Sequence, residues 1–207
     1  MAIGTFDELK TAVANWLGRD DLTDRIPEFI ALAEGRMNRT IFARAQEVRA
    51  TATLTADDAY TALPTDLRTI RVVQLNTTPT TILRFMPPGM LERTYPSTTT
   101  GKPLAYSVIG GEIKFAPTPD TGYTAEILYT QGIPALSASQ TNNTYLVRSP
   151  DAYLYGTLVE AHRYLMDPNQ ANNFDQLFGR AMAEMKAEDD EARWGGSPLQ
   201  MKTASAP

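Results

Sequence analysis

The stretch Phe174-Asp-Gln-Leu-Phe-Gly-Arg-Ala-Met-Ala-Glu-Met185 decides how we interpret the fold of this 207-residue chain. Its apolar side chains recur at intervals of three and four residues, which places them on one face of an α-helix. The stripe comprises Phe174, Leu177, Phe178, Ala181, Met182 and Met185. Burial of each large apolar side chain is worth about 1.5 to 3 kcal/mol, so this helix must pack against another apolar surface.

The opposite end of the chain contains two predicted helices that offer such a surface. Thr5 and Glu8 have the spacing of a helix capping box, and Gly18 marks the end of the first helix. A second helix begins at Thr23 or Asp24. The apolar faces comprise Phe6, Leu9, Val13, Trp16 and Leu17 in the first helix and Ile26, Phe29, Ile30, Ala33, Met37 and Ile41 in the second. We expect these two helices to form an antiparallel hairpin.

One more helix is predicted immediately before the last one. It follows Ser149-Pro150-Asp151 and ends where Asp167-Pro168-Asn169 interrupts the pattern. Its apolar face comprises Tyr153, Leu154, Leu158, Ala161 and Leu165. Four apolar stripes, two from each end of the chain, are covered most simply in one four-helix bundle.

The middle of the chain has the two-residue periodicity of β-strands. Apolar and polar residues alternate over 47–55, and β-branched residues are frequent in 70–75. A hairpin is predicted over 105–116, because Gly110-Gly111 accepts the positive φ angles of a two-residue turn. Further strands are expected at 82–85 and 123–130, and a short helical turn at 90–93. Together these segments predict a small antiparallel sheet.

These elements predict an α+β protein, mainly a helical bundle formed by the N- and C-terminal helices with an antiparallel β insertion. The predicted parts are an N-terminal helical hairpin at 1–45, a β-rich insertion at 46–148, C-terminal helices at 149–194 and an extended C-terminal arm at 195–207. The arm is rich in Gly, Ser, Pro and Ala, so we expect it to be flexible in the isolated chain.

Composition argues against most kinds of catalytic and metal site. The chain has no cysteine, and its one histidine, His162, has no second histidine at the spacing of a zinc-protease motif. We interpret His162 as a structural or surface residue and expect neither a metal nor a cofactor. The net charge of −5 argues against tight wrapping of nucleic acid. The sequence lacks a run of about 18 apolar residues and a signal-peptide pattern, so we expect no membrane association and no export.

Three stretches of the chain resemble the head-to-tail adaptor (connector) proteins of tailed bacteriophages. They are Tyr60 to Arg71, then Gly101 to Tyr106 together with Gly111 to Pro117, and Asp151 to Ala161. Their order and spacing match as well. The similarity runs from about Thr5 to Trp194 and therefore covers nearly the whole chain.

The resemblance implies a structural virion protein without enzymatic activity. In that family, copies form a ring, a dodecamer, that binds beneath the portal protein, extends the DNA channel and presents its other side to the tail. The implied partners are the portal protein, other copies of the chain, tail tube, nozzle or tail-fibre-bearing proteins, and double-stranded DNA that passes through the lumen without specific binding. The implied location is the head-tail junction of the virion, after assembly in the host cytoplasm, with roles in tail assembly and DNA ejection.

The resemblance also places the portal contact in the C-terminal arm. The portal-contact candidates are Trp194, Gly195, Gly196, Ser197, Pro198, Leu199 and Met201.

The candidates for lining the channel are the acidic residues Glu188, Asp189, Asp190 and Glu191. Carboxylates near the C-terminal end of a helix oppose its macrodipole, at about 0.3 to 1 kcal/mol each, so local stability does not explain them. One interpretation is an acidic lining that keeps DNA from adhering, and the other is a solvated helix end.

Two other classes of function stay open. A peptidoglycan hydrolase of the tail vertex would use a pair of carboxylates, although no spacing in the sequence selects a particular pair. The second alternative is a soluble binding module outside any virus.

Overall fold

The chain divides into two compact units. The computed structural model describes residues 3–40, 46–96 and 98–194. The helical unit consists of residues 1–45 and 133–207, and the β unit consists of residues 46–132. The α+β class predicted from the sequence is confirmed, because helices from both ends of the chain pack together and the strands lie between them in the sequence.

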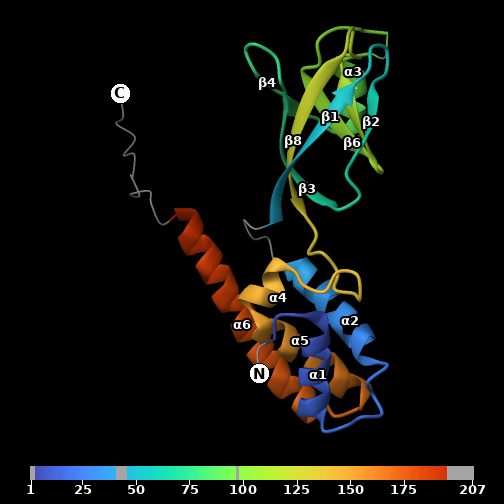
Figure 1. Cartoon of the computed structure of the whole chain (residues 1–207). Coiled ribbons are helices and arrows are strands. Elements are labelled where there is room, and N and C mark those ends of the chain that lie inside the picture. The colour runs from blue at the N-terminus through green and yellow to red at the C-terminus, as the bar shows by residue number, and fades with distance from the viewer. Residues whose placement is uncertain (1–2, 41–45, 97, 195–207) are drawn as a thin grey trace. The chain divides into compact units, whose positions relative to one another are not determined.

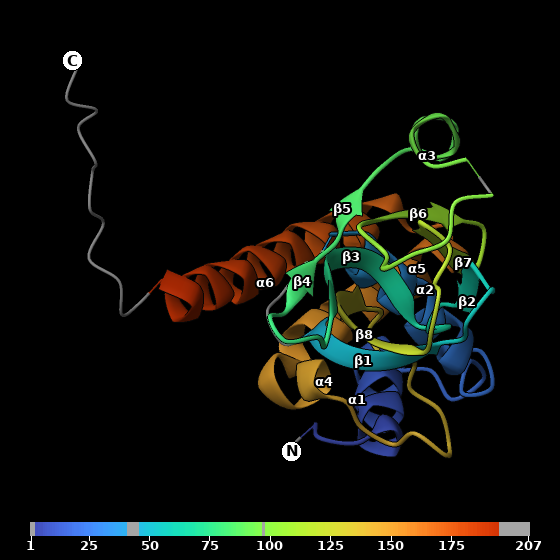
Figure 2. The same cartoon turned by 90° about the horizontal axis from the view of Figure 1, so that it is seen from above.

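The helical unit is organised around its fourth helix in chain order. The unit contains α1 (Phe6–Leu17), α2 (Ile26–Thr40), α4 (Thr144–Arg148), α5 (Pro150–Tyr164) and α6 (Pro168–Trp194). Helix α5 contacts the other four helices of the unit (Figure 1). Residues on all sides of α5 are buried over most of its length. Helix α6 is much longer than α5, and its C-terminal end extends past α4 and α5 in both Figure 1 and Figure 2.

The first helix has the ends that the sequence predicts. The Thr5 hydroxyl accepts a hydrogen bond from the Glu8 amide at 3.3 Å, and a Glu8 carboxylate oxygen accepts one from the Thr5 amide at 3.0 Å. Gly18 follows the last turn with φ 62°, a left-handed conformation that glycine adopts without strain. Helix α2 begins at Ile26, later than predicted, because residues 20–25 form turns in which Leu22 is already buried.

A close approach between three helices occurs at Gly156 of α5. A Cβ atom at this position would lie 2.9 Å from Cε2 of Phe178 in α6 and 3.3 Å from Cβ of Ala33 in α2. Phe178 is 5% exposed, so its ring is enclosed in the core. The absence of a side chain at Gly156 therefore lets α2, α5 and α6 pack together.

One local prediction for the helical unit was wrong, and two features of its helices were not predicted. Trp16 was placed on the buried face of α1 but is 55% exposed. The short helix α4 was not predicted, although the Asn143 side chain caps it by accepting a hydrogen bond from the Leu146 amide. Helix α6 begins at Pro168, because Asp167 accepts a hydrogen bond from the Gln170 amide and proline suits the first helical position.

The β unit contains two four-stranded sheets rather than one small sheet. The first sheet has the order β1-β8-β3-β4, and the second has the order β2-β7-β6-β5. The strands are β1 (Glu47–Leu54), β2 (Tyr60–Ala62), β3 (Leu67–Leu75), β4 (Thr81–Ile82), β5 (Arg84–Phe85), β6 (Ala105–Ile109), β7 (Glu112–Ala116) and β8 (Tyr123–Gln131), with helix α3 (Pro88–Thr94) between β5 and β6. The pairs are antiparallel except for β5 with β6, which is parallel.

The apolar core of the β unit explains why both sheets form. Side chains from each sheet meet in one cluster that includes Leu54, Val73 and Ile127 from the first sheet and Ile113 and Phe115 from the second. The predicted hairpin over 105–116 is confirmed as β6 and β7, and Gly110 has the positive φ of 63° that its turn requires.

The β insertion ends earlier than the expected boundary at 148. The chain leaves the β unit after Gly132, and the segment from Ile133 onward belongs to the helical unit. Ile133 and Leu136 are buried in the helical core, and the Ile133 amide donates a hydrogen bond to Asn38 Oδ1 at 2.7 Å. Apolar burial and this hydrogen bond fix residues 133–148 against the helices, although most of the segment has no regular secondary structure.

Candidate interaction surfaces

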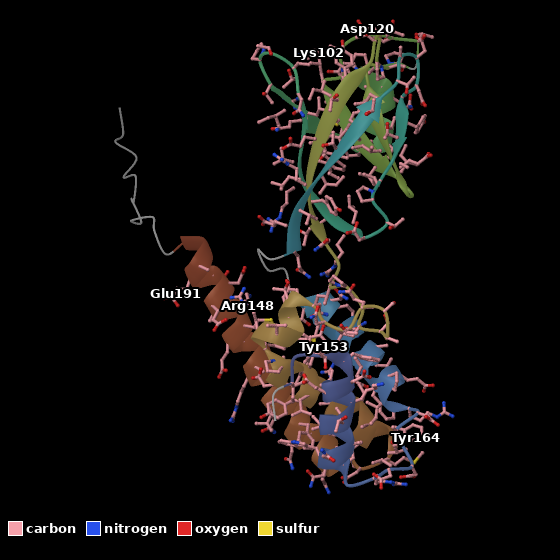
Figure 3. The ribbon with its side chains drawn as sticks, in the orientation of Figure 1. Lys102, Asp120, Arg148, Tyr153, Tyr164 and Glu191 are labelled. Atoms are coloured by element: carbon pink, nitrogen blue, oxygen red, sulfur yellow. The ribbon has the colours of Figure 1, made fainter. Side chains whose placement is uncertain are left out.

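The acidic segment at the end of α6 does not present all its carboxylates on one side. Consecutive residues of an α-helix point about 100° apart, so four in a row cannot share a face. Asp189 continues the buried stripe of Met182 and Met185, whereas Glu188 and Glu191 are exposed, as is Asp190. Glu191 lies on the outer side of the helix end (Figure 3).

Glu188 of this segment pairs with a cation of α4. Its carboxylate lies 3.6 Å from the Arg148 guanidinium, with both side chains more than half exposed. Such an exposed pair contributes at most about 1 kcal/mol. Glu188 and Glu191 occupy neighbouring helical positions three residues apart, so these two can face a common partner or channel.

The proposed portal-contact residues lie at the limit of the described chain. Trp194 is the last residue of α6, and its side chain is outside the described part. Gly195, Gly196, Ser197, Pro198, Leu199 and Met201 also lie outside the described residues.

A buried polar network joins the segment that follows the β unit to the helices. Glu34 of α2 accepts hydrogen bonds from the Leu136 amide at 3.0 Å and from the Tyr153 hydroxyl at 3.3 Å. The Asn143 side-chain amide donates to the Tyr153 hydroxyl at 2.7 Å and to the Pro134 carbonyl at 2.9 Å. Tyr153 is fully buried and points into the helical unit (Figure 3).

Burial perturbs the acid-base chemistry of this network. Glu34 is 4% exposed, and removal from water raises the pKa of its carboxyl to about 7, although the two hydrogen bonds oppose the shift. Burial and the nearby Glu34 carboxylate raise the pKa of Tyr153. Tyr153 is therefore a hydrogen-bond donor throughout the physiological range, and Glu34 is the group whose charge changes.

A second network of charged side chains ties α2, α5 and α6 together. The Arg36 guanidinium lies 2.6 Å from Asp175 and 3.3 Å from Glu160, and it stacks 4.9 Å from the Phe178 ring centroid. Arg163 also approaches both carboxylates, at 2.9 Å from Glu160 and 3.8 Å from Asp175. Glu160 is 11% exposed, so this network depends on partly buried charges and stabilises the contact between the helices.

An aromatic cluster reaches the surface of the helical unit at Trp16. The Trp16 ring contacts Tyr155 and Phe174 edge-on, each at a centroid distance of 6.1 Å. His162 stacks on Phe174 at 5.3 Å, and its Nδ1 atom is 3.9 Å from an Asp167 carboxylate oxygen. His162 therefore contributes to packing, in line with the structural interpretation of this residue.

The helical unit exposes further large apolar side chains. They are Leu32, Val147, Tyr164 and Met166, which range from 55% to 89% exposed. Exposed aromatic and apolar residues are typical of protein contact surfaces when they gather into patches.

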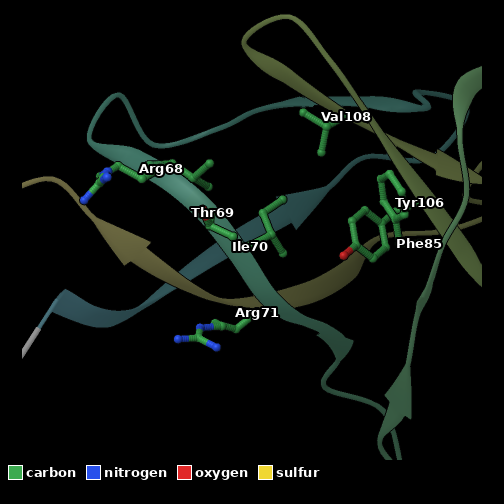
Figure 4. A pocket seen from close by; sticks show the side chains of 8 residues that line it. Arg68, Thr69, Ile70, Arg71, Phe85, Tyr106 and Val108 are labelled. Atoms are coloured by element: carbon green, nitrogen blue, oxygen red, sulfur yellow. The ribbon is translucent and has the colours of Figure 1, made fainter. Parts of the chain in front are cut away.

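The β unit contains a cleft of about 520 Å³ between β3 and the β5–β6 pair (Figure 4). Its lining comprises Leu67, Arg68, Thr69, Ile70 and Arg71 of β3, Phe85 of β5, and Tyr106 and Val108 of β6.

The walls of this cleft differ in character. In Figure 4 the Ile70 side chain points toward Phe85 and Tyr106, whereas Arg68 and Arg71 extend away from these two rings. Phe85 is 56% exposed and contacts Tyr106 edge-on at a centroid distance of 5.6 Å.

Sequence reasoning missed the cleft because only the tertiary fold brings its residues together. Arg68 and Arg71 lie in the stretch from Tyr60 to Arg71, which supports the resemblance to phage adaptors, and Phe85 was assigned to a short strand. The one local signal was the spacing of Arg68, Ile70 and Arg71 in a strand otherwise rich in β-branched residues.

Neither a metal centre nor a membrane segment is found in the described part of the chain. Within residues 3–40, 46–96 and 98–194, His, Asp and Glu side chains form no group of three or more that could hold a metal ion. None of the helices over the same ranges has the length and apolar character needed to span a bilayer.

Comparison with known proteins identifies a family for nearly the whole chain. The family model described as SU10 adaptor protein matches residues 4–202. This match includes all three stretches on which the resemblance to phage adaptors rests. A search of curated proteins finds no match to the chain.

Proposed function

This chain belongs to the SU10 adaptor protein family, and we propose that it forms the ring that joins a phage portal to the tail. Membership of the family makes the chain a structural protein of the phage virion that associates with portal and tail components. Copies of the chain would assemble head-to-tail around the DNA channel, an arrangement in which one surface of each copy meets a different surface of the next. The family match over residues 4–202 is the observation that carries the proposal.

The exposed apolar residues of the helical unit support assembly with other proteins. Trp16, Leu32 and Tyr164 are each more than half exposed, although burial of such side chains is favourable. Contacts with neighbouring copies or with the portal would cover them. We assign this role to the helical unit because its helices come from both ends of the chain and include α6, which leads directly to the C-terminal arm.

The C-terminal arm is our candidate for the portal contact. Deletion of residues 196–207 removes most of the arm and leaves every described element intact. We expect the truncated chain to keep its thermal stability and to bind portal rings more weakly. Full portal binding by the truncated chain would show that the contact lies elsewhere.

The acidic end of α6 is our candidate for the channel lining. Because Asp189 is buried, the lining reduces to Glu188, Asp190 and Glu191. Replacement of these three by glutamine removes charge without removing bulk, and Asp189→Asn is the matched control for a structural effect. Slower DNA ejection or packaging in the triple variant supports the lining, and unchanged rates in a folded triple variant count against it.

No observation on the described residues favours peptidoglycan hydrolysis as a second function. A hydrolase of this kind needs two carboxyl groups on either side of a substrate cleft. Glu34 has the raised pKa of a general acid, but its side chain is enclosed in the core. The residues that line the cleft of the β unit include no carboxylate.

The ring proposal is tested by mixing the purified full-length chain with purified portal rings from the same phage. Sedimentation and negative-stain electron microscopy then show whether a complex forms. We expect a stoichiometric complex in which a second ring lies coaxially on the portal. Failure to co-sediment under conditions where both proteins are folded would contradict the proposal.

A further inference from the structure

We infer that the cleft of the β unit binds an extended, acidic segment of a partner protein, which adds a strand to the open edge of β3. The inference concerns a single chain and does not require a ring. We take this partner protein to be a tail component, an assignment that rests on the function proposed above.

The first observation is an incomplete sheet edge beside the cleft. Strand β8 pairs with β3 on one side from Leu67 to Leu75, with shifts of register at Arg68 and at Arg71. On the other side, β4 pairs only with Gln74 and Leu75, and the Leu83 amide donates to the Val73 carbonyl. Among the residues that the structure describes, no strand lies along this side of β3 from Thr69 to Val72.

The second sheet also has an incomplete edge, beside β6. Strand β5 pairs with β6 only at Ala105 and Tyr106, so within the described ranges no strand follows that side of β6 from Ser107 to Ile109. The cleft lies between these two short open edges. An incoming extended segment would find main-chain hydrogen-bond partners along β3, which is the mode of recognition by strand addition.

The second observation is that this edge lacks proline and lysine, two of the residues that protect exposed edges against pairing. Natural sheets blunt exposed edges with proline, with charged side chains, with β-bulges or with a covering loop. Residues 69–72 are Thr-Ile-Arg-Val, so the protection of this edge is limited to the charge of Arg71 and the irregular register at Arg68 and Arg71. The side chain of Ile70 is only partly buried, so its apolar surface is available to a partner.

The third observation is the chemistry of the cleft walls. Ile70, Phe85 and Val108 give one wall an apolar surface, and the 56% exposed Phe85 ring would be covered by a bound chain. The two charged residues of the lining are both arginines. The Arg71 guanidinium lies 3.4 Å from the carboxylate of Glu47, the first residue of β1. The Arg71 side chain is nevertheless 40% exposed.

These walls define the partner segment. Side chains of a strand alternate between two sides, so apolar residues would face Ile70 and Phe85 while carboxylates at intervening positions face the arginines. A volume of about 520 Å³ falls within the range of roughly 300 to 1,000 Å³ typical of ligand sites. An extended peptide of alternating apolar and acidic residues fits both walls.

The test uses the purified full-length chain and a synthetic peptide of about eight residues in which valine alternates with glutamate. One control peptide carries lysine in place of glutamate, and another is N-methylated at alternate positions, which removes main-chain donors. Fluorescence anisotropy measures affinity, and amide hydrogen exchange identifies the segment that is protected.

We expect the acidic peptide to bind and to slow exchange over Thr69–Val72, and both control peptides to bind much more weakly. Arg68→Glu combined with Arg71→Glu should weaken binding about tenfold or more, because it reverses two charges at the site. Arg84→Glu is the matched control, since Arg84 is exposed on β5 but does not line the cleft, and it should change affinity by less than about twofold.

Phe85→Ala provides a second test if the double arginine variant does not fold. It trims an exposed ring and should also weaken binding, by about threefold to tenfold. The proposal is overturned if the acidic peptide does not bind at millimolar concentration, or if binding is insensitive to N-methylation and to the arginine substitutions. Concentration-dependent self-association of the chain that Phe85→Ala abolishes would identify a second copy as the occupant and would overturn the assignment to a partner protein.

Discussion

Gly156 and Gly179 lie in neighbouring helices, and the same substitution to alanine should have opposite effects at the two positions. In a helix interior, alanine is favoured over glycine by about 0.8 to 1 kcal/mol. At Gly179 of α6 no atom lies within 4 Å of an added Cβ, so Gly179→Ala should stabilise the helical unit by about 1 kcal/mol.

Gly156 is different because its added Cβ would overlap with an enclosed side chain. The distances to Phe178 would be 2.9 Å to Cε2 and 3.1 Å to Cδ2, and Ala33 Cβ would be 3.3 Å away. The Phe178 ring cannot easily move, since it is 5% exposed and Arg36 stacks on it. Overpacking of this kind costs about 1 to 3 kcal/mol. We place Gly156 in the upper half of that range, which leaves Gly156→Ala about 1 to 2 kcal/mol less stable than the native chain after the helix-propensity gain.

Urea unfolding followed by far-ultraviolet circular dichroism is the appropriate assay, because almost all the helix lies in the helical unit. A second substitution, Phe178→Leu, makes room for the new methyl group. In a double-mutant cycle, Gly156→Ala should therefore cost at least about 1 kcal/mol less in the Phe178→Leu background. Equal stabilisation by Gly156→Ala and Gly179→Ala would refute the close packing of α2, α5 and α6 at Gly156.

Two further predictions concern the charged groups of the helical unit. Because the Glu34 pKa of about 7 lies above its unfolded value of 4.5, the folded chain holds this proton longer, and the free energy of unfolding should fall as pH rises between these values. The loss of unfolding free energy is on the order of 3 kcal/mol and is complete above the folded pKa. Glu34→Gln should remove this pH dependence, as measured by urea unfolding from about pH 5 to about pH 8. Parallel plots of unfolding free energy against pH for the two proteins would contradict Glu34 as the cause. Arg36→Ala should destabilise the chain by about 1 to 3 kcal/mol, because it leaves the carboxylates of Glu160 and Asp175 with one arginine fewer. As a control, Arg19→Ala removes an equally short but exposed ion pair with Asp21 and should lower the unfolding free energy by less than about 0.5 kcal/mol. Similar losses of unfolding free energy in the two variants would show that burial of the Arg36 network is unimportant.

Features with local causes could be predicted from the sequence. The capping box of Thr5 and Glu8 and the Gly110-Gly111 turn each depend on a few adjacent residues, and both occur as predicted. The apolar stripe from Phe174 to Met185 also led to the correct conclusion that helices from both ends of the chain pack together. Periodicity identifies which face of a helix needs cover, and few elements were available to provide it.

Features that depend on distant parts of the chain were not predictable in the same way. The parallel pairing of β5 with β6 joins residues separated by helix α3, and no turn signal marks it. Trp16 fits the apolar period of α1, yet it lies at the edge of the stripe, where the neighbouring aromatic rings cover only part of it. Helix α4 was not predicted, because a helix this short produces no periodic pattern.

The same distinction between local and distant causes applies to the candidate sites. Glu188 to Glu191 were recognisable as an acidic segment, but only the structure separates buried Asp189 from its exposed neighbours. Glu34 does not belong to the apolar face predicted for the second helix, and its buried position depends on the distant residues Leu136 and Tyr153. The arginine-lined cleft likewise requires β3 and β6 to meet.

Cryo-electron microscopy of the head-tail vertex in virions that contain this chain tests the proposed function most directly. We predict a closed ring of density between the portal and the first tail component into which both the helical unit and the β unit can be fitted. A vertex in which the portal contacts the tail without this chain, or in which single copies lie away from the DNA channel, would contradict the proposed role as a head-to-tail adaptor.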